Sequence, residues 1–485
     1  VGGVKSNSGA SLVFDTFNDA TNAFVVGSNH LGIQRDLLLF NGGVPVGQSY
    51  DMTWNIKWTS KSFIADDYYT TEWRIPLSSF RYREGETKWR FGSYQRDSKN
   101  TAWNMWHKVP ENQDFSDMAF LGDMIFEKPL KKSKSKKIFI PYINGISAND
   151  YENQNKFNEF EFGGDAKFVI DNSLTLDLTI NPDFSQVEVD DQITNLTRFE
   201  IFLPEKRQFF IQNSDLFSSF GDRGDSNPFF SRRIGIAKDL DGNNIQNKIV
   251  AGLRLSGKIN NDFRVGLLNM LTEEDLKNNI ASNNNTVLAL QHKVFNRSNI
   301  SFLFINRESI KDYDFESENP YNRVIGIDYN LASSDSKWEG KYYFHKSITP
   351  NLDSDDISAG FRTNYNSRNI NFKVGALYIG DNFNSDLGYI KRKSIYKIDP
   401  RVGYTYWPEN KKILNYEFEI APFITWASDF NSLLSDYFIF TKWDVNFKSG
   451  VNFNISLRNQ YTYLFDEFDP TGINNGNSLP ANSDY

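Results

Sequence analysis

A long alternation of apolar and polar residues near the C-terminus constrains this chain more than any other feature. Between Phe447 and Tyr463 nearly every second residue is large and apolar, and most residues between them are polar. Successive side chains of a β-strand point to opposite faces, so this run predicts a strand with one apolar and one polar face. The run exceeds the usual soluble strand of about 5–6 residues. Because a tilted bilayer crossing takes roughly 9–11 residues, we predict a membrane-spanning strand here.

The same alternation recurs from Ile138 onward. It is clear at residues 174–180, 338–345, 370–378 and 416–426. Further candidate strands lie near 158–170, 248–257, 262–270, 286–295, 299–307, 323–332, 357–366, 398–407 and 436–446. The connections alternate in length: those at 258–262 and 296–299 are short, whereas those at 271–285, 308–322 and 381–397 are long. This asymmetry is typical of outer-membrane barrels, so residues 138–485 predict an antiparallel transmembrane β-barrel of about 14–18 strands. A soluble sandwich or propeller is the alternative.

The composition fits a barrel better than a helical membrane protein. No apolar run approaches the roughly 18–20 residues that a membrane helix needs. The mean hydropathy of −0.53 would ordinarily indicate a soluble chain. A barrel escapes that inference because only alternate residues of its strands face lipid. Aromatic residues make up 15% of the chain, and barrels use such residues on the lipid face and at its interfaces.

Charge and cysteine content exclude several classes of protein. The net charge is −8, and no basic block indicates nucleic-acid binding. The absence of cysteine excludes a disulfide scaffold and thiolate metal sites. The first residues carry no export signal, and residues 472–485 have the composition of a loop, so we expect both ends of the natural protein to extend further.

Residues 1–129 differ from the rest of the chain. They hold six of the ten tryptophans and several short strand-like runs, including one pair around Asn18-Asp19. Frequent turn residues between short strands predict a β-sandwich. The lysine-rich cluster Lys131–Lys137 then predicts a linker at residues 130–137. A solvated hinge explains this cluster, and contact with anionic lipid head groups is the other explanation.

Residues 181–230 interrupt the barrel pattern. Mixed charges and aromatic residues stand close together, as in Leu203–Phe210. Such a segment does not suit a lipid face, so we predict that it folds into the lumen or packs at the periplasmic mouth. An ordinary long loop outside the membrane is the alternative.

Two parts of the chain resemble a known family. Residues 11–126 resemble the later part of a carbohydrate-binding module of family nine, through the pieces Phe14–Asp19, Gly32–Asp36, Trp54–Trp58, Glu72–Pro76, Trp89–Phe91 and Gln95-Arg96. The segment Asn181–Phe210 is similar to the signature of an outer-membrane family that carries this module before its barrel, and Asp381–Tyr389 is similar to a later motif of that family. The resemblance implies a periplasmic β-sandwich followed by a transmembrane barrel. The biochemical role of that family is poorly defined, so the resemblance implies architecture more than activity.

Sugar binding by such a module would use exposed aromatic faces with polar groups beside them. The candidates are Trp54, Trp58, Trp103, Trp106, Asp51, Arg96 and Asn104. Burial of these tryptophans in the sandwich core is the competing interpretation, because large aromatic residues are usually buried. Trp73 and Trp89 lie inside predicted strands and are assigned to the core.

Catalytic and metal-binding motifs do not stand out. The four histidines lack metal-ligand spacing, and neither a nucleophile elbow nor a phosphate loop is present. The run Asp239–Asn243 resembles the start of a calcium loop without its distal glutamate, so a hairpin turn at Asp241-Gly242 is the better interpretation. We therefore predict a protein that is not an enzyme and that needs neither metal nor cofactor.

Charged residues on the polar faces of the strands would point into the barrel. The candidates are Arg254, Arg264, Lys341, Lys373, Glu417, Glu419 and Arg458, and Arg232 and Arg233 share their character. Such charges can set pore selectivity. Alternatively they pair with one another or with the luminal segment and simply fill the barrel.

Three functions remain open from the sequence. The first is a transport or channel barrel in the outer membrane, whose periplasmic N-terminal domain captures a glycan or another ligand. The second is a non-enzymatic subunit of a larger outer-membrane complex, in which that domain docks proteins. An outer-membrane hydrolase is the third, and the lack of a catalytic constellation counts against it. The expected partners are outer-membrane lipid and lipopolysaccharide, a glycan, or other outer-membrane proteins.

Overall fold

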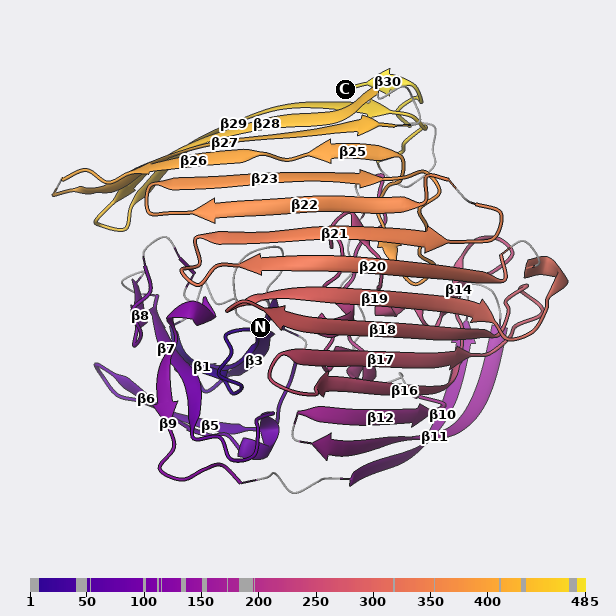
Figure 1. Ribbon diagram of the computed structural model, residues 1–485, viewed down its shortest axis with the longest axis horizontal. Helices are drawn as coiled ribbons and strands as arrows, with labels where there is room; N and C mark the ends of the chain where they lie inside the picture. The colour runs from indigo at the N-terminus through magenta and orange to yellow at the C-terminus, as the bar shows by residue number, and fades with distance from the viewer. Residues whose placement is uncertain are drawn as a thin grey trace.

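The structure is a computed structural model, and it is an all-β fold with a large antiparallel sheet (Figure 1). It describes residues 8–40, 50–52, 54–98, 102–110, 113–114, 116–131, 137–150, 155–171, 173–182, 195, 197–316, 319–352, 354–409, 411–428, 433–470 and 478–485. The described chain divides into three parts. They are the N-terminal region (residues 8–131), the wall sheet that begins at Lys137, and the inner segment (residues 197–246).

The N-terminal region is built on a seven-stranded antiparallel sheet. Its order is β4-β3-β2-β1-β7-β8, with β9 paired to β7. The bounds are β1 (Gly9–Asp15), β2 (Ala23–Asn29), β3 (Gln34–Leu39), β4 (Tyr50–Asp51), β7 (Lys88–Asp97), β8 (Ala102–Met105) and β9 (Gly122–Ile125). A separate hairpin of β5 (Thr59–Ile64) and β6 (Tyr69–Arg74) completes the strands described in this region.

Apolar side chains pack against both faces of this sheet. One cluster surrounds Trp89 and includes Phe14, Phe24 and Trp58. The other contains Val13, Val25, Tyr94 and Met118. Both clusters follow from the alternation along β1 and β2, which sends neighbouring apolar residues to opposite faces.

The predicted boundary at residue 129 needs a small correction. Leu130 is buried in the cluster around Trp89, so the core of the N-terminal region extends past residue 129. Lys137 already belongs to the first strand of the wall sheet. Residues 132–136 of the predicted linker lie outside the described residues.

The wall sheet has 17 strands joined in chain order by antiparallel pairing, except where the inner segment intervenes. Its bounds are β10 (Lys137–Asp150), β11 (Asn155–Asp171), β12 (Leu174–Ile180), β16 (Ile249–Lys258), β17 (Phe263–Thr272), β18 (Asn283–Val294), β19 (Ser298–Ser309), β20 (Tyr321–Ala332), β21 (Trp338–Ile348), β22 (Ile357–Asn366), β23 (Ile370–Ile379), β25 (Ile395–Ile398), β26 (Arg401–Tyr406), β27 (Ile413–Ala427), β28 (Leu433–Phe447), β29 (Asn452–Leu464) and β30 (Ser483–Asp484). The sheet curves strongly (Figure 1), and within the described residues β10 and β29 are not paired with each other.

Most strands fall where the alternation predicts them, with two corrections. The run from Phe447 to Tyr463 is not one strand, because Phe447 ends β28 and β29 begins only at Asn452 after a tight turn. The candidate at 398–407 is divided, since β25 ends at Ile398 and β26 begins at Arg401. The first difference arises at a chain reversal, about which alternation carries no information. The second is an interruption within one strand line, because β25 and β26 run in the same direction and both pair with β23 and β27.

On several wall strands the polar residues are buried and apolar residues of the opposite face are exposed. On β12, Thr175, Asp177 and Thr179 are buried, whereas Ile180 on the opposite face is 65% exposed. On β21, Glu339 and His345 are buried, whereas Phe344 is 52% exposed. This is the reverse of the arrangement in a sheet that packs in a soluble core, where the apolar face is covered.

The inner segment fills the concave side of the wall sheet. It contains α1 (Gln208–Ile211), α2 (Asp215–Ser218), β13 (Ser226–Asn227), β14 (Ile236–Lys238) and β15 (Asn244–Gln246). Six of its apolar residues belong to one cluster with inward residues of the wall strands, such as Leu268, Leu303 and Leu377. The six are Phe210, Leu216, Phe217, Phe220, Phe229 and Ile234.

The segment packs against the inward residues of the wall sheet, and it extends further than the predicted residues 181–230. It continues past residue 230 to the β14–β15 hairpin, whose turn contains the predicted Asp241-Gly242 pair. Residues 183–194 and 196 of the predicted segment lie outside the described residues. None of the helices in the described part of the chain is long and apolar enough to cross a membrane.

The two ends of the wall strands differ. Short turns join β16 to β17, β18 to β19 and β20 to β21, and the N-terminal region lies at this end of the strands (Figure 1). The opposite end carries the longer connections, for example residues 273–282 and 380–394. The predicted alternation of short and long connections is therefore present.

Gly221 provides a test of how tightly the inner segment is seated. Its φ of +65° disfavours other residues, and an added Cβ would meet the Ser226 carbonyl oxygen and lie 3.1 Å from His345 Cε1. We predict that Gly221→Ala lowers the free energy of unfolding by about 1–3 kcal/mol, the usual cost of such strain. The measurement is denaturant unfolding of the chain in detergent. Gly224→Ala is the control, because its methyl group would meet only Asp222 Oδ1 at 3.5 Å. Equal midpoints for the two variants would contradict this packing.

Candidate functional site

The inward-facing arginines of β16 and β17 join the wall to the inner segment. Arg254 Nη2 lies 2.9 Å from Asp177 Oδ2 of β12, and Arg264 Nη1 lies 2.8 Å from Asp215 Oδ2 of α2. Both side chains are buried. A buried charge is tolerated when a partner and hydrogen bonds compensate it. The Arg264 pair joins the wall to the inner segment, whereas the Arg254 pair joins two wall strands, and Arg254 reaches the inner segment through Gln212 Oε1 at 3.4 Å.

Lys341 belongs to a second group of polar contacts between the wall and the inner segment, and Asp328 lies at its centre. The buried Asp328 carboxylate lies 3.0 Å from Lys341 Nζ and 2.7 Å from His345 Nε2. It also accepts a 2.9 Å hydrogen bond from the Gly221 backbone N–H of the inner segment. Lys341 donates in addition to the carbonyl oxygen of Ser219. Asp328 and Lys341 of the wall therefore both form hydrogen bonds with the backbone of the turn that follows α2.

Lys373 is part of a third group on the inner face. Its ammonium lies 3.1 Å from Asp399 Oδ2, and that carboxylate lies 3.3 Å from Arg362 Nη2. Arg362 reaches the inner segment as well, because it lies 3.2 Å from Asp222 Oδ2. Lys397 of β25 forms an ion pair with Asp225 of the inner segment.

Of the remaining lumen candidates, Glu417 and Glu419 line a hollow without residues of the inner segment, whereas Arg458 lines one that Phe199 and Asp225 of that segment share. Glu417 accepts a 3.1 Å hydrogen bond from Asn446, and Glu419 lies 3.7 Å from Arg401. Both line a hollow of about 280 Å³. The Arg458 guanidinium lies 4.7 Å from the centre of the Phe438 ring and lines a separate hollow of about 190 Å³. Arg232 and Arg233 are not wall residues, since they lie in the short 3-10 helix Ser231–Arg233 of the inner segment.

Two of the glycan candidates pack into the apolar cluster around Trp89. Trp58 is buried there in edge contact with Trp73, and Trp54 is half-buried with its ring centre 4.9 Å from that of Phe24. Asp51 is occupied differently, because its Oδ2 accepts a 2.8 Å hydrogen bond from Ser214 of the inner segment.

The other glycan candidates lie around β8. Trp103 packs against the cluster of Val13 and Met118, with the Arg96 guanidinium 5.2 Å from its ring centre. Trp106 is 62% exposed and makes an edge contact with Phe91, and Asn104 is exposed. Trp103 and Trp106 therefore contact different clusters, and only Trp106 of the four tryptophans presents most of its surface to solvent.

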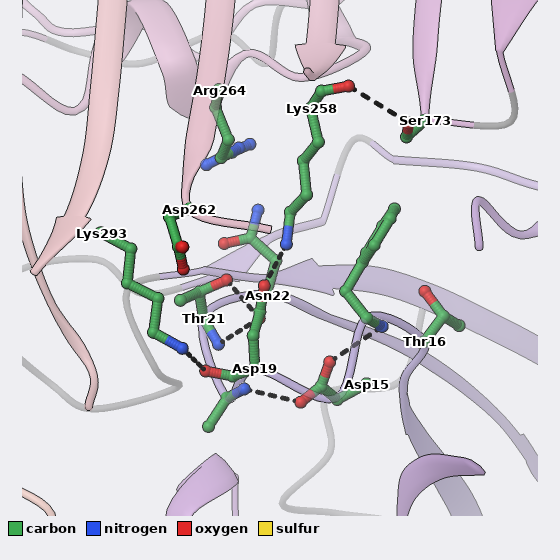
Figure 2. Close-up of polar contacts among 12 residues, drawn as sticks. Asp15, Thr16, Asp19, Thr21, Asn22, Ser173, Lys258, Asp262, Arg264 and Lys293 are labelled. Carbon is green, nitrogen blue, oxygen red and sulfur yellow. Dashed lines mark hydrogen bonds and ion pairs between the residues drawn. The ribbon is translucent and has the colours of Figure 1, made fainter. Parts of the chain in front are cut away.

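The loop between β1 and β2 fastens the N-terminal region to the short turns of the wall (Figure 2). Asp19 forms a buried ion pair with Lys258 at the end of β16, and its carbonyl oxygen accepts a 3.3 Å bond from Lys293 of β18. A similar pair joins Arg297 to Asp117 at 3.0 Å. These contacts, together with that of Asp51, seat the N-terminal region on the wall and the inner segment.

The Asp15 carboxylate fixes the backbone of that loop by hydrogen bonds. Its two carboxylate oxygens accept hydrogen bonds from the backbone N–H groups of Phe17 at 3.2 Å and Ala20 at 2.7 Å. Burial, reinforced by the negative charge of Asp19, raises the pKa of Asp15 to about 7. We therefore expect the loop that holds the N-terminal region on the wall to respond to pH.

A cavity of about 510 Å³ opens beside this contact. We call it the junction cavity, because the N-terminal region, the wall and the inner segment all line it. It brings together residues that the sequence assigned to separate roles, namely the glycan candidate Trp54 and the lumen candidates Arg254 and Arg264. Its volume lies within the roughly 300–1,000 Å³ of small-molecule sites.

Several residues of the cavity escaped the sequence analysis. Lys167 and Asp177 lie on polar strand faces and could have been found by extending the alternation through β11 and β12. Arg81 gives no such signal, because it lies in an irregular stretch after the 3-10 helix Leu77–Ser79. Among the described residues, no group of three or more histidines or carboxylates could hold a metal ion.

The fold and site define an all-β protein whose large antiparallel sheet encloses an internal segment and carries an N-terminal region at one end. Residues 136–483 match a family described as a domain of unknown function, DUF5916. The chain belongs to this family. A search of curated proteins found no match.

Three solved structures illustrate what the search of known folds returned. The crystal structure of Pseudomonas aeruginosa OccK5 (OpdH) is 11% identical with a TM-score of 0.29, over 94% of this chain and 91% of that chain. Acinetobacter baumannii OccAB2 is 8% identical with a TM-score of 0.29, over 94% and 90% of the two chains. Pseudomonas aeruginosa OccK11 (OpdR) is 8% identical with a TM-score of 0.30, over 95% and 98%.

The raised pKa of Asp15 predicts a pH dependence. Its carboxyl titrates near 3.8 when the chain is unfolded and near 7 when it is folded, so the folded state binds the additional proton between these values. Stability should therefore be fully present below pH 4 and decline as the pH rises through 7. The measurement is thermal unfolding of the full chain in detergent, followed by tryptophan fluorescence. Asp15→Asn should remove this slope between pH 4 and 7, and an unchanged slope would contradict the assignment.

Proposed function

We propose that this chain is an outer-membrane β-barrel protein of the transport type, whose lumen is closed by the inner segment. In this proposal the N-terminal region lies in the periplasm and binds a ligand at the barrel mouth. The protein is not an enzyme in this account, and its immediate surroundings are outer-membrane lipid and lipopolysaccharide.

The proposal rests on the wall sheet, where apolar residues of the convex face are exposed and polar residues of the opposite face are buried. A neighbouring set of residues on its convex face is apolar and exposed, for example Ile325, Ile327, Phe344 and Phe361. Register places Ile327 opposite Phe344 on adjacent strands, so the exposed apolar surface is continuous. A soluble monomer rarely exposes such a surface, whereas hydrocarbon covers it at no cost in hydrogen bonding.

The orientation follows from the two ends of the strands. Outer-membrane barrels have short periplasmic turns and longer extracellular loops. The N-terminal region lies at the short-turn end, through contacts such as Asp19 with Lys258 and Asp117 with Arg297. This supports a periplasmic N-terminal region.

A barrel in hydrocarbon cannot leave a strand edge unpaired, because the backbone groups would have no partner there. β10 and β30 are the outer strands of the sheet over the part of the chain that the structure describes, and β30 covers only Tyr463 and Leu464 of β29. We therefore propose that these edges are closed in the membrane by strand pairing beyond that described.

The finer proposal for the N-terminal region is a β-sandwich similar to a family-nine carbohydrate-binding module. The β5–β6 hairpin supports it, because Trp58 and Trp73 connect the hairpin to the cluster on one face of the seven-stranded sheet. A glycan is the ligand class that this similarity suggests.

Transport through this barrel requires the inner segment to move. Its apolar cluster and its ion pairs to Arg264, Arg362 and Lys397 fill the space that a solute would cross. The same packing favours a second function, a non-conducting subunit of an outer-membrane complex in which the N-terminal region docks proteins. The two functions differ in whether the inner segment ever leaves its place.

Membrane insertion can be tested on the exposed apolar face. Ile327 is 55% exposed in the middle of β20, and we predict that Ile327→Arg reduces assembly into the membrane. Arginine at the bilayer midplane costs about 2–4 kcal/mol on a barrel's lipid face. Leu276→Arg is the matched control, because Leu276 is 60% exposed in a connection outside the strands. The measurement is the fraction of folded chain in purified outer membranes. Equal losses for both variants would argue against a lipid-facing β20.

Mobility of the inner segment can be tested with a reversible cross-link. The hydroxyl oxygens of Ser226 in the inner segment and Ser358 on the wall lie 2.7 Å apart, and the chain has no cysteine of its own. We predict that the double variant Ser226→Cys with Ser358→Cys, once oxidised, abolishes solute passage in planar bilayers or liposomes. Reduction should restore passage, and the two single variants should be insensitive to oxidant. A chain that never conducts, reduced or oxidised, and that co-purifies with outer-membrane proteins would favour the scaffold function.

A further inference from the structure

The junction cavity has more positive charge than its carboxylates balance. Five cations line it, and two of them are satisfied by carboxylates beside it, Lys258 by Asp19 and Arg264 by Asp215. The other three are Arg81, Lys167 and Arg254, and the carboxylates of the lining are Asp165 and Asp177. One positive charge is therefore left over, which is three cations less two carboxylates.

The unbalanced positive charge lies among Arg81, Lys167 and Arg254. Asp177 lies 2.9 Å from Arg254 and 3.4 Å from Lys167, so one carboxylate serves two cations. Arg81 donates to the hydroxyl of Thr175 at 3.1 Å and makes no ion pair with a described carboxylate. Burial lowers the pKa of Arg81 to about 10, which shows how strongly its charge is desolvated.

Arg254 adds unused hydrogen-bond donors at the same place. Its side chain is only 2% exposed, and its Nε and Nη1 atoms find no acceptor among the described residues. The Phe209 ring lies 5.2 Å from its guanidinium carbon. Buried donors of a charged group are costly to leave unmet, so their presence points to an acceptor that the described residues do not supply.

The rest of the lining suits a sugar ring better than a purely apolar ligand. Trp54 and Phe24 supply aromatic surface from the N-terminal region. Asn55, Ser79, Gln212 and Asn213 supply amide and hydroxyl groups around it. Aromatic faces with a few polar groups are the usual means of holding a ligand that has both apolar faces and hydroxyls.

We propose that the junction cavity binds a sugar acid, with its carboxylate beside Arg81 and Arg254 and its ring against Trp54. This inference rests on the proposed function and names the ligand class that the periplasmic mouth would receive. Arg81 and Arg254 act as the charge-recognising pair, because guanidinium groups match a carboxylate in geometry and charge. Trp54 then acts from the N-terminal region, so one ligand touches both the region and the wall.

The test is binding of digalacturonate to the full chain in detergent, by calorimetry. Arg81→Gln is the principal variant, because Arg81 has only a hydroxyl partner and its removal leaves no buried carboxylate unpaired. We expect its Kd to rise about tenfold or more, as loss of a charged hydrogen bond commonly produces. Arg74→Gln is the matched control, an exposed arginine on the nearby strand β6, and should leave Kd unchanged. Trp54→Leu should weaken binding of the disaccharide.

Two comparisons on the unmodified chain keep the test independent of how the variants fold. The neutral sugar cellobiose should bind at least tenfold more weakly than digalacturonate, and added salt should weaken digalacturonate binding. Equal binding of the neutral sugar would overturn the anionic site. Equal binding of inorganic phosphate, with no effect of Trp54→Leu, would overturn the sugar ring. Absence of binding by a chain that assembles in membranes overturns this inference alone, whereas failure to assemble overturns the proposed function.

Discussion

The pairing of buried charges on the inner face of the wall sheet is the constraint on which the rest of the structure depends. Asp177, Asp328 and Asp399 each serve two or more cations or donors, and without these partners the polar strand faces could not be buried. Because the polar faces turn inward, the apolar faces must turn outward. The exposed apolar surface is therefore a consequence of the charge pairing on the inner face, and loss of that pairing would remove the reason for the outward apolar face.

The inner segment and the N-terminal region complete that pairing from the other side. The inner segment supplies Asp215, Asp222 and Asp225 to cations of the wall. The N-terminal region supplies Asp19 and Asp117 at the short-turn end. In these five pairs the carboxylates come from the inner segment and the N-terminal region, and the cations come from the wall and its turns. In the junction cavity the lining cations exceed the available carboxylates by one. An anion is therefore the occupant that its chemistry favours.

Alternation in the sequence predicted the wall sheet well, because side-chain period alone decides which residues share a strand face. It assigned Arg254, Arg264 and Lys341 to the polar face, and in the structure these side chains are buried or half-buried. It could not show that Arg254 meets Asp177, because that contact depends on the register between two strands separated by the inner segment. It could not reveal Arg81 at all, since Arg81 lies in an irregular stretch. Some tryptophans of the N-terminal region lie in its core, whereas Trp106 lies at the surface. Composition alone does not predict which tryptophan is buried.

The measurement that tests the inverted sheet most directly is site-directed spin labelling along β20 in lipid bilayers. Single cysteines placed in turn at residues 323–328 would each carry a label, which the cysteine-free chain allows. The account predicts that accessibility to oxygen dissolved in lipid alternates with period two, with maxima at 325 and 327 and minima at 324, 326 and 328. Labels at 325 and 327 that were instead shielded from lipid, or equally accessible to a water-soluble relaxant, would contradict it.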